Sequence, residues 1–167
     1  MDTKTLDLGC GETPKNPFKC DQVYGIDIRE HISGNIKSAD LAIEPIPFAD
    51  ETFDYVTAFD FIEHVPRVIY MPTRRFCFVE LMNEVYRILK PGGIFMSFTP
   101  AFPAGPAWRD PTHVNIITAE TFPMYFDDTV RLAAMYGFNG YFRILKQARH
   151  ENKIHLVTHM RKVRPNA

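Results

Sequence analysis

The chain reads Leu6-Asp7-Leu8-Gly9-Cys10-Gly11-Glu12-Thr13 almost at its start, and the other predicted elements are arranged around this stretch. A short apolar run that breaks off into Gly-Cys-Gly is typical of a buried strand that ends in a tight turn. Glycine has no Cβ, so the backbone of such a turn can come very close to another group. The stretch therefore predicts a nucleotide-binding loop at the end of the first strand.

Composition limits the class of protein. The chain has 167 residues, of which 46% are hydrophobic and 13% aromatic, which is enough for one buried core and favours a single domain over residues 1–167. Lys and Arg number 19 against 20 Asp and Glu, and the formal charge of −1 provides no general basic field for nucleic acid or an anionic membrane. We expect no nucleic acid partner.

The cysteines Cys10, Cys20 and Cys77 are odd in number and lack the spacing of metal ligands. They therefore indicate a reducing compartment rather than a disulfide framework, and we expect no metal site. No apolar run approaches the roughly 20 residues that cross a bilayer, and no leader is visible at the N-terminus. These features predict a cytoplasmic location and no membrane span.

Apolar runs and breaker residues predict the order of the elements. Strands are expected at residues 4–8, 22–28, 35–41, 53–59 and 94–98, with an antiparallel hairpin at 141–148 and 154–160. The apolar face of residues 75–90 predicts the longest helix, stopped by Pro91-Gly92-Gly93. Prolines predict loops at 12–21, 43–50 and 99–111, and residues 121–136 hold a further expected helix.

This pattern predicts an α/β sheet, in which ligands bind outside the carboxyl ends of the strands. Candidate contacts fall at these strand ends: the glycine turn and the acids Asp27, Asp40 and Asp60. One concave site is able to gather them all.

Five motifs in this order resemble the class I S-adenosylmethionine-dependent methyltransferases, in particular their small-molecule branch. They are Leu6-Asp7-Leu8-Gly9-Cys10-Gly11, Tyr24-Gly25-Ile26-Asp27, Asp40-Leu41 with residues 46–56, Phe61-Ile62-Glu63-His64-Val65, and residues 81–93 ending in Leu89-Lys90-Pro91-Gly92-Gly93. The match extends over residues 4–99. The resemblance implies a doubly wound, Rossmann-like, mostly parallel seven-stranded sheet with an antiparallel C-terminal hairpin. The third glycine of the family's turn is absent here, and the first crossover helix is expected to be shortened or missing.

The resemblance also implies how S-adenosylmethionine is held. Asp7 would hold its amino group, and the backbone of the Gly9-Cys10-Gly11 turn would pack against its amino acid and ribose portions. Asp27 with Ile28 would bind the ribose hydroxyls. Asp40 and Leu41 would contact the adenine. Asp40 is also compatible with a surface acid that precedes a loop. Phe59 and Asp60 would close the methionine end.

Acceptor residues are expected in the loop Trp108-Arg109-Asp110-Pro111-Thr112-His113. His113 is a candidate general base with Asp110 orienting it, or else an ordinary loop histidine. Trp108 and Arg109 are expected to hold the acceptor or to pin the loop. His64 is expected to contact the acceptor, or to form a structural helix-start pair with Glu63.

The predicted function is transfer of a methyl group from S-adenosylmethionine to an O or N atom of a small-molecule acceptor. Two alternatives remain open: a non-catalytic subunit that binds the cofactor and supports a partner, and a nicotinamide-binding oxidoreductase. No N-terminal helices are visible that would cover the site. The lid is therefore expected to come from elsewhere or from a second subunit, either in a homodimer or from a different partner.

Overall fold

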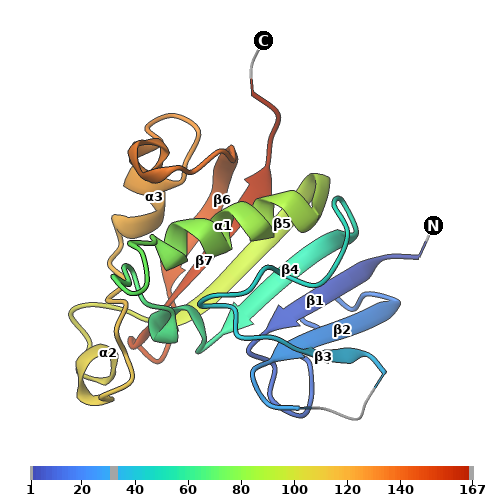
Figure 1. The fold of residues 1–167 in the computed structure, drawn as a ribbon, viewed down its shortest axis with the longest axis horizontal. Helices are drawn as coiled ribbons and strands as arrows, with labels where there is room; N and C mark the ends of the chain where they lie inside the picture. The colour runs from blue at the N-terminus through green and yellow to red at the C-terminus, as the bar shows by residue number, and fades with distance from the viewer. Residues whose placement is uncertain (1, 31–33, 166–167) are drawn as a thin grey trace.

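The computed structural model describes residues 2–30 and 34–165 and contains one seven-stranded sheet (Figure 1). The strand order is β3-β2-β1-β4-β5-β7-β6. The strands are β1 (Lys4–Leu8), β2 (Gln22–Asp27), β3 (Ile36–Ser38), β4 (Phe53–Phe59), β5 (Leu89–Pro100), β6 (Phe142–Arg149) and β7 (His155–Lys162). The first five run parallel, and β6 and β7 form the antiparallel hairpin that adds to β5. The predicted fold class is confirmed.

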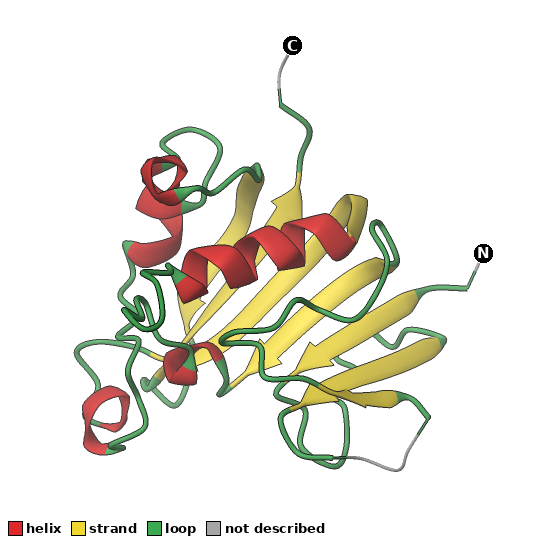
Figure 2. Cartoon of the chain, in the orientation of Figure 1, coloured by secondary structure: helices red, strands yellow, loops and turns green. Residues whose placement is uncertain are grey.

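One long helix, α1 (Cys77–Ile88), lies across one face of the sheet (Figure 2). Its buried side chains include Leu81, Met82 and Val85, and they belong to the same core as Leu6 and Val56 of the sheet. The other helices of the described residues are one or two turns long: η1 (Ile62–His64), α2 (Pro106–Arg109), α3 (Thr121–Tyr125) and η2 (Leu132–Tyr136). None of the described helices has the length and apolarity to span a membrane.

The connection from β1 to β2 contains no helix in residues 9–21, as predicted. Side chains alternate across a strand, so Asp7 and Tyr55 project from the face opposite the one that buries Leu6 and Val56 under α1. On that opposite face the ring of Phe18 stacks on Tyr55 with centroids 4.1 Å apart. An irregular loop therefore takes the place of the first crossover helix.

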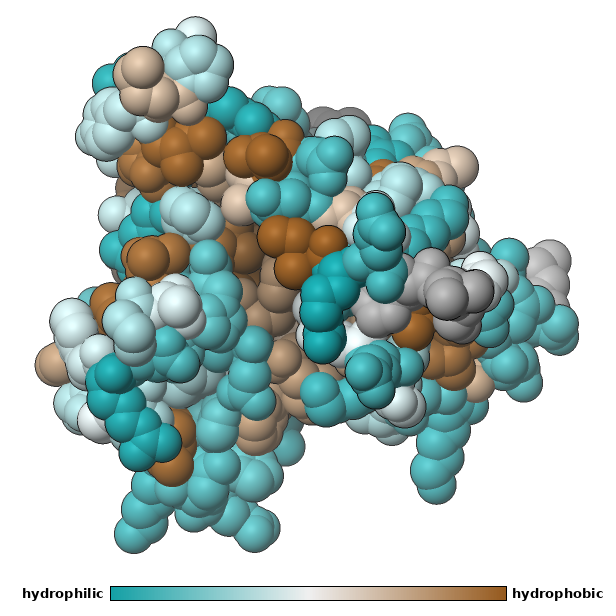
Figure 3. Space-filling view, turned by 60° about the horizontal axis from the view of Figure 1, so that its bottom comes forward, coloured by the Kyte–Doolittle hydropathy of each residue, from teal (hydrophilic) through white to brown (hydrophobic). Residues whose placement is uncertain are grey.

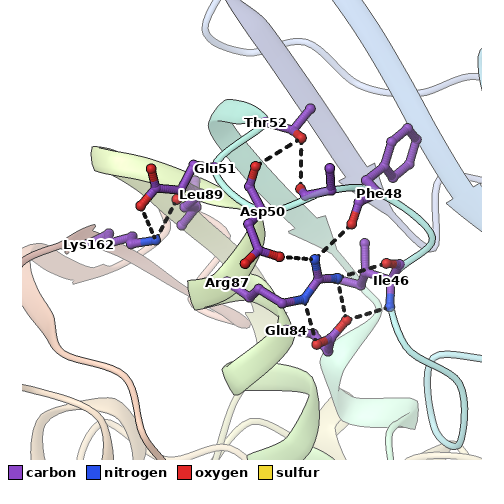
Figure 4. A network of polar contacts seen from close by, with 10 residues as sticks. Ile46, Phe48, Asp50, Glu51, Thr52, Glu84, Arg87, Leu89 and Lys162 are labelled. Carbon is purple, nitrogen blue, oxygen red and sulfur yellow. Dashed lines mark hydrogen bonds and ion pairs between the residues drawn. The ribbon is translucent and has the colours of Figure 1, made fainter.

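The connection from β3 to β4 is also irregular, and Arg87 of α1 fixes it in place (Figure 4). The guanidinium donates hydrogen bonds to the carbonyl oxygens of Ile46 (2.9 Å) and Phe48 (2.8 Å) and to Oδ1 of Asp50 (2.8 Å). Glu84 accepts two further bonds from it and one from the N–H of Ile46. Arg87 thus stabilises the conformation of this loop, which its prolines alone do not determine.

Several predicted boundaries were wrong. The strand expected at 35–41 is limited to Ile36–Ser38, which places Asp40 in the turn after it. The helix ends at Ile88 because Leu89 is already extended and pairs with Phe53. Pro91-Gly92-Gly93 therefore lies within β5, in the irregular stretch between the paired residues Leu89 and Ile94.

Two further segments also differ from prediction. Residues 99–111 are not one loop, since β5 continues to Pro100 and α2 follows. The helix expected at 121–136 is split into α3 and η2, with Asp127 between them accepting hydrogen bonds from the N–H of Thr129 and of Ile144. The Asp127 side chain thus connects this segment to β6, and the expected helix ends after its first turns.

Candidate functional site

A cavity of about 300 Å³ opens beside the carboxyl ends of β1, β2 and β4. This is where the order of strands reverses, because the chain leaves β1 toward β2 and returns to β4 on the other side of β1. Figure 3 shows apolar surface in a hollow between two largely hydrophilic parts of the molecule. The predicted site residues that line the cavity are Gly9, Asp27, Ile28, Asp40, Leu41, Asp60 and His64.

The glycine turn forms one wall of the cavity. Gly9 has a φ of +66°, and a Cβ built on it would lie 2.5 Å from Cδ2 of Phe61, another lining residue. Gly11 has a φ of +63°, and its N–H donates to Oδ2 of Asp27 at 2.9 Å. Cys10 is buried between them, and burial raises the pKa of its thiol to about 11. Cys10 and Gly11 shape the turn and are not part of the cavity lining.

Asp27 is held by groups that keep it ionised. Its Oδ1 accepts hydrogen bonds from Nε of Arg29 (2.8 Å) and from the N–H of Arg29 (3.1 Å). The bond from the Arg29 side chain is the main cause that lowers the pKa of Asp27 to about 2. The contact of Arg29 with Asp27 was not predicted from the sequence.

Asp40, Leu41 and Ile28 form the part of the lining farther along the sheet edge. Oδ1 of Asp40 accepts a hydrogen bond from the N–H of Ala42 at 3.0 Å, so this acid also stabilises its own turn. Leu41 is buried, whereas Ile28 is 66% exposed. These two apolar side chains offer contacts to a flat apolar ring.

Asp60 lies on the other side of the glycine turn and is exposed. Its Oδ1 forms a hydrogen bond with Nε2 of His155 at 2.8 Å, which ties the end of β4 to β7. Phe59 is outside the cavity lining, with its ring against Phe98 and the Lys15 ammonium 4.8 Å from its centroid. His155 was missed by sequence reasoning, because nothing local in the sequence places the hairpin beside β4.

Asp7 is fully buried and does not line the cavity. Its carboxylate accepts hydrogen bonds from Oγ1 of Thr57 (2.7 Å) and from the N–H of Lys15 (2.8 Å). Asp7 therefore fastens the irregular loop after β1 onto the sheet. A contact with the cofactor's amino group stays a prediction.

In Asp7→Asn, the free energy of unfolding is expected to decrease less with rising pH than it does in the wild type. Burial raises the pKa of Asp7, so the native protein binds this proton more tightly than the unfolded chain. The contribution of Asp7 is greatest at pH values below its unfolded pKa and is lost as the pH rises through the raised native pKa. Urea unfolding between pH 4 and 8 measures this, with the exposed Asp21→Asn as control. A constant difference between Asp7→Asn and wild type over this range contradicts the raised pKa.

The segment between α2 and α3, residues 110–120, carries His113 and is here called the histidine loop. It packs directly on η1, although about fifty residues separate the two in sequence. The carbonyl of Glu63 accepts hydrogen bonds from the N–H groups of Val114 and Asn115, both at 2.9 Å. Nδ2 of the buried Asn115 donates to the carbonyl of Ile62 at 3.0 Å. These bonds bring His64 and His113 together.

His64, Asp110 and His113 form a cluster, as the predicted roles require. The two imidazole rings meet edge to face with centroids 4.8 Å apart. Oδ1 of Asp110 accepts a hydrogen bond from the hydroxyl of Thr112 (2.7 Å), which is also bonded to Nδ1 of His64 (3.0 Å). Oδ2 of Asp110 lies 3.8 Å from Nε2 of His113. Asp110 therefore lies near both histidines, and its role in orienting His113 stays a prediction.

Trp108 and Arg109 are on α2, away from the cavity lining. Trp108 is 56% exposed and packs edge-on against Phe102 at 6.1 Å between centroids. Their contact with an acceptor stays a prediction.

The fold places the chain in the Rossmann-like class of proteins. A family model described as "Methyltransferase domain" matches residues 6–97, which is more than half of the chain. The chain belongs to this methyltransferase domain family.

Comparison with known proteins agrees with this membership. The chain is similar to the demethylmenaquinone methyltransferase of Listeria welshimeri, with 29% identity over 126 residues that cover 64% of this chain and 49% of the relative. The chain thus spans about half the length of the curated relatives it matches.

Solved structures show the same fold at lower identity. A SAM dependent methyltransferase from Archaeoglobus fulgidus has a TM-score of 0.59 and 17% identity, covering 96% of this chain and 86% of that one. A complex between the Haloferax volcanii Trm112 methyltransferase activator and a methyltransferase gives a TM-score of 0.64 and 11% identity, covering 98% and 84%. At these identities the likeness establishes the fold alone.

Proposed function

We propose that this chain binds S-adenosylmethionine in the cavity beside the glycine turn and transfers its methyl group to a small-molecule acceptor. The cavity carries the proposal, because its lining gathers Gly9, Asp27, Asp40 and Asp60 from four separate connections of the sheet. Family membership supports the same cofactor, since relatives of the same fold are SAM dependent methyltransferases.

The lining residues suit the parts of the cofactor. Asp27 would accept hydrogen bonds from the ribose hydroxyls, because its carboxylate is ionised and lines the cavity. Leu41 and Ile28 would contact the adenine, with Asp40 at its polar edge. The exposed carboxylate of Asp60 would lie near the sulfonium, which supplies an electrophilic methyl group.

The chain's own contribution to methyl transfer is alignment and exclusion of water, since an in-line displacement at carbon needs no covalent help from a side chain. An acceptor that loses a proton needs a group to take it. The cluster of His64, Asp110 and His113 is next to the cavity through His64 and supplies imidazole nitrogens for that proton.

The acceptor class and the partner remain part of the proposal. A Listeria relative is named for methylating demethylmenaquinone, which supports a small-molecule acceptor. A fold neighbour is recorded with a methyltransferase activator, which supports the alternative that a second subunit assists this chain. The buried, unpaired cysteines agree with the predicted cytoplasmic location.

Isothermal titration with S-adenosylmethionine and, separately, with a nicotinamide dinucleotide tests the cofactor. We expect saturable binding of the former, reduced about 10-fold or more in Asp27→Asn because a hydrogen bond to a charged group contributes about 1.5–3 kcal/mol. Asp21→Asn changes an exposed acid outside the cavity lining and is the control. This variant is expected to bind S-adenosylmethionine like wild type. Binding of the nicotinamide dinucleotide alone contradicts the proposal.

A further inference from the structure

Glu63, His64 and His113 offer one ligand atom each, and these atoms all lie within 4.8 Å of one another. Glu63 and His64 are on η1, and His113 comes from the loop between α2 and α3. Glu63 is 1% exposed and the His113 side chain is 10% exposed, so two of the three groups are at least nine-tenths buried. Such burial is unusual for a carboxylate beside two imidazoles.

Two atoms of this cluster are buried without a hydrogen-bond partner among the described residues: Oε1 of Glu63 and Nδ1 of His113. A buried polar atom without a hydrogen-bond partner is destabilising, and native proteins contain few of them. Two in one cluster, one on a carboxylate and one on an imidazole, therefore indicate a bound group that accepts electron pairs from both. A metal cation is such a group.

Other polar groups lie next to the remaining polar atoms of the three side chains. Oε2 of Glu63 accepts a hydrogen bond from Oγ1 of the buried Thr99 at 2.7 Å. Nε2 of His113 faces Oδ2 of Asp110 at 3.8 Å, and one ring nitrogen of His64 is bonded to Thr112. Metal-binding histidines commonly have the second ring nitrogen oriented by a carboxylate or another polar group. The cluster has this outer arrangement.

We propose that Glu63, His64 and His113 bind one divalent transition metal ion. Two imidazoles with one carboxylate are a ligand set of zinc and of other first-row metals, and three protein ligands leave a position open. Bonds of about 2.1 Å require ligand atoms about 3.4 Å apart, so ligand atoms that now lie up to 4.8 Å apart would approach one another by up to about 1.4 Å on binding. This proposal differs from the expectation drawn from the sequence, which was that the chain has no metal site.

Metal binding by His64 and His113 and the general-base role of the same imidazoles are alternatives, because a metal on Nδ1 of His113 excludes that nitrogen from accepting a proton. The open position would lie beside the cofactor cavity, because His64 belongs to both. A contribution of the metal to methyl transfer rests on the proposed function, whereas metal binding itself does not. The two are therefore testable separately.

The test is a titration of Zn²⁺ into the tag-free full chain after removal of metals with a chelator. Equilibrium dialysis with elemental analysis is expected to find one tightly bound equivalent in wild type. Glu63→Gln and His113→Ala are expected to weaken binding at least about 10–100-fold, the range for the loss of a metal-supporting group. His150→Ala removes an exposed histidine outside the cluster and is expected to match wild type. Co²⁺ gives a second readout through its ligand-field absorption.

Glu63→Gln keeps the size of the side chain and an acceptor for Thr99, so it answers the question even where His113→Ala fails to fold. No saturable equivalent in wild type, or equal affinity in Glu63→Gln and wild type, overturns the proposal. Titration of S-adenosylmethionine into the metal-free protein is run in parallel. If the metal-free protein does not bind S-adenosylmethionine, the proposed function is contradicted, whereas the conclusion on metal binding is unaffected.

Discussion

Replacing Gly9 with alanine is expected to abolish measurable S-adenosylmethionine binding and to lower the free energy of unfolding by about 2–5 kcal/mol. A residue with a Cβ pays about 1–2 kcal/mol for the left-handed conformation that Gly9 adopts at a φ of +66°. The added methyl group would also lie 2.5 Å from Cδ2 of Phe61 and force the ring to move, which in a packed region costs about 1–3 kcal/mol. Because Phe61 lines the cavity, its displacement changes the shape of the site.

Gly92→Ala is the matched control for this substitution. Gly92 also has a positive φ, +81°, but a Cβ there meets no atom within 4 Å. It is expected to lose only the backbone part, about 1–2 kcal/mol, and to bind the cofactor like wild type. Urea unfolding and titration calorimetry measure both quantities.

A double substitution separates the steric part for Gly9. In Gly9→Ala with Phe61→Ala the clash is removed, so the combined loss of stability is expected to be smaller than the sum of the single losses. Equal losses in Gly9→Ala and Gly92→Ala, with normal cofactor binding in both, would show that the contact with Phe61 is unimportant.

The parts of the fold that were predictable are those where burial leaves a periodic or apolar pattern. The strands at residues 4–8 and 53–59 have the predicted bounds, because parallel strands covered on both faces read as continuous apolar runs. The meeting of Gly9 with Asp27 and Asp60 follows from topology, since the carboxyl ends of neighbouring parallel strands share one edge of the sheet.

The parts that were not predictable depend on contacts between irregular segments. The packing of η1 against the histidine loop rests on hydrogen bonds from Val114 and Asn115 to Glu63, which leave no periodic trace in the sequence. The burial of Glu63 therefore went unpredicted, and the metal ligand set with it. Arg29 was missed for a related reason, since a long charged side chain at a strand end is equally compatible with solvent.

Arg87→Ala is expected to lower the free energy of unfolding by about 2–4 kcal/mol, because it removes several hydrogen bonds worth about 1–3 kcal/mol each while the loop partly relaxes. The carbonyls of Ile46 and Phe48 lose a donor, and Glu84 loses its cation in a partly buried site, where Arg87 is 29% and Glu84 23% exposed. Ala39 to Ala42 of the same connection line the cofactor cavity, so S-adenosylmethionine affinity is expected to fall as well.

Two further arginine variants distinguish the geometry of this contact from its charge. Arg87→Lys keeps the charge but cannot reproduce the planar set of donors that meets Ile46, Phe48, Asp50 and Glu84, so it is expected to recover less than half of the lost stability. Arg161→Ala, at an exposed position of β7, is expected to change stability by no more than about 0.5 kcal/mol. Urea unfolding compares the three. If Arg87→Lys equals wild type, charge alone fixes the connection between β3 and β4; if Arg87→Ala equals Arg161→Ala, the connection is held by its apolar contacts with the core.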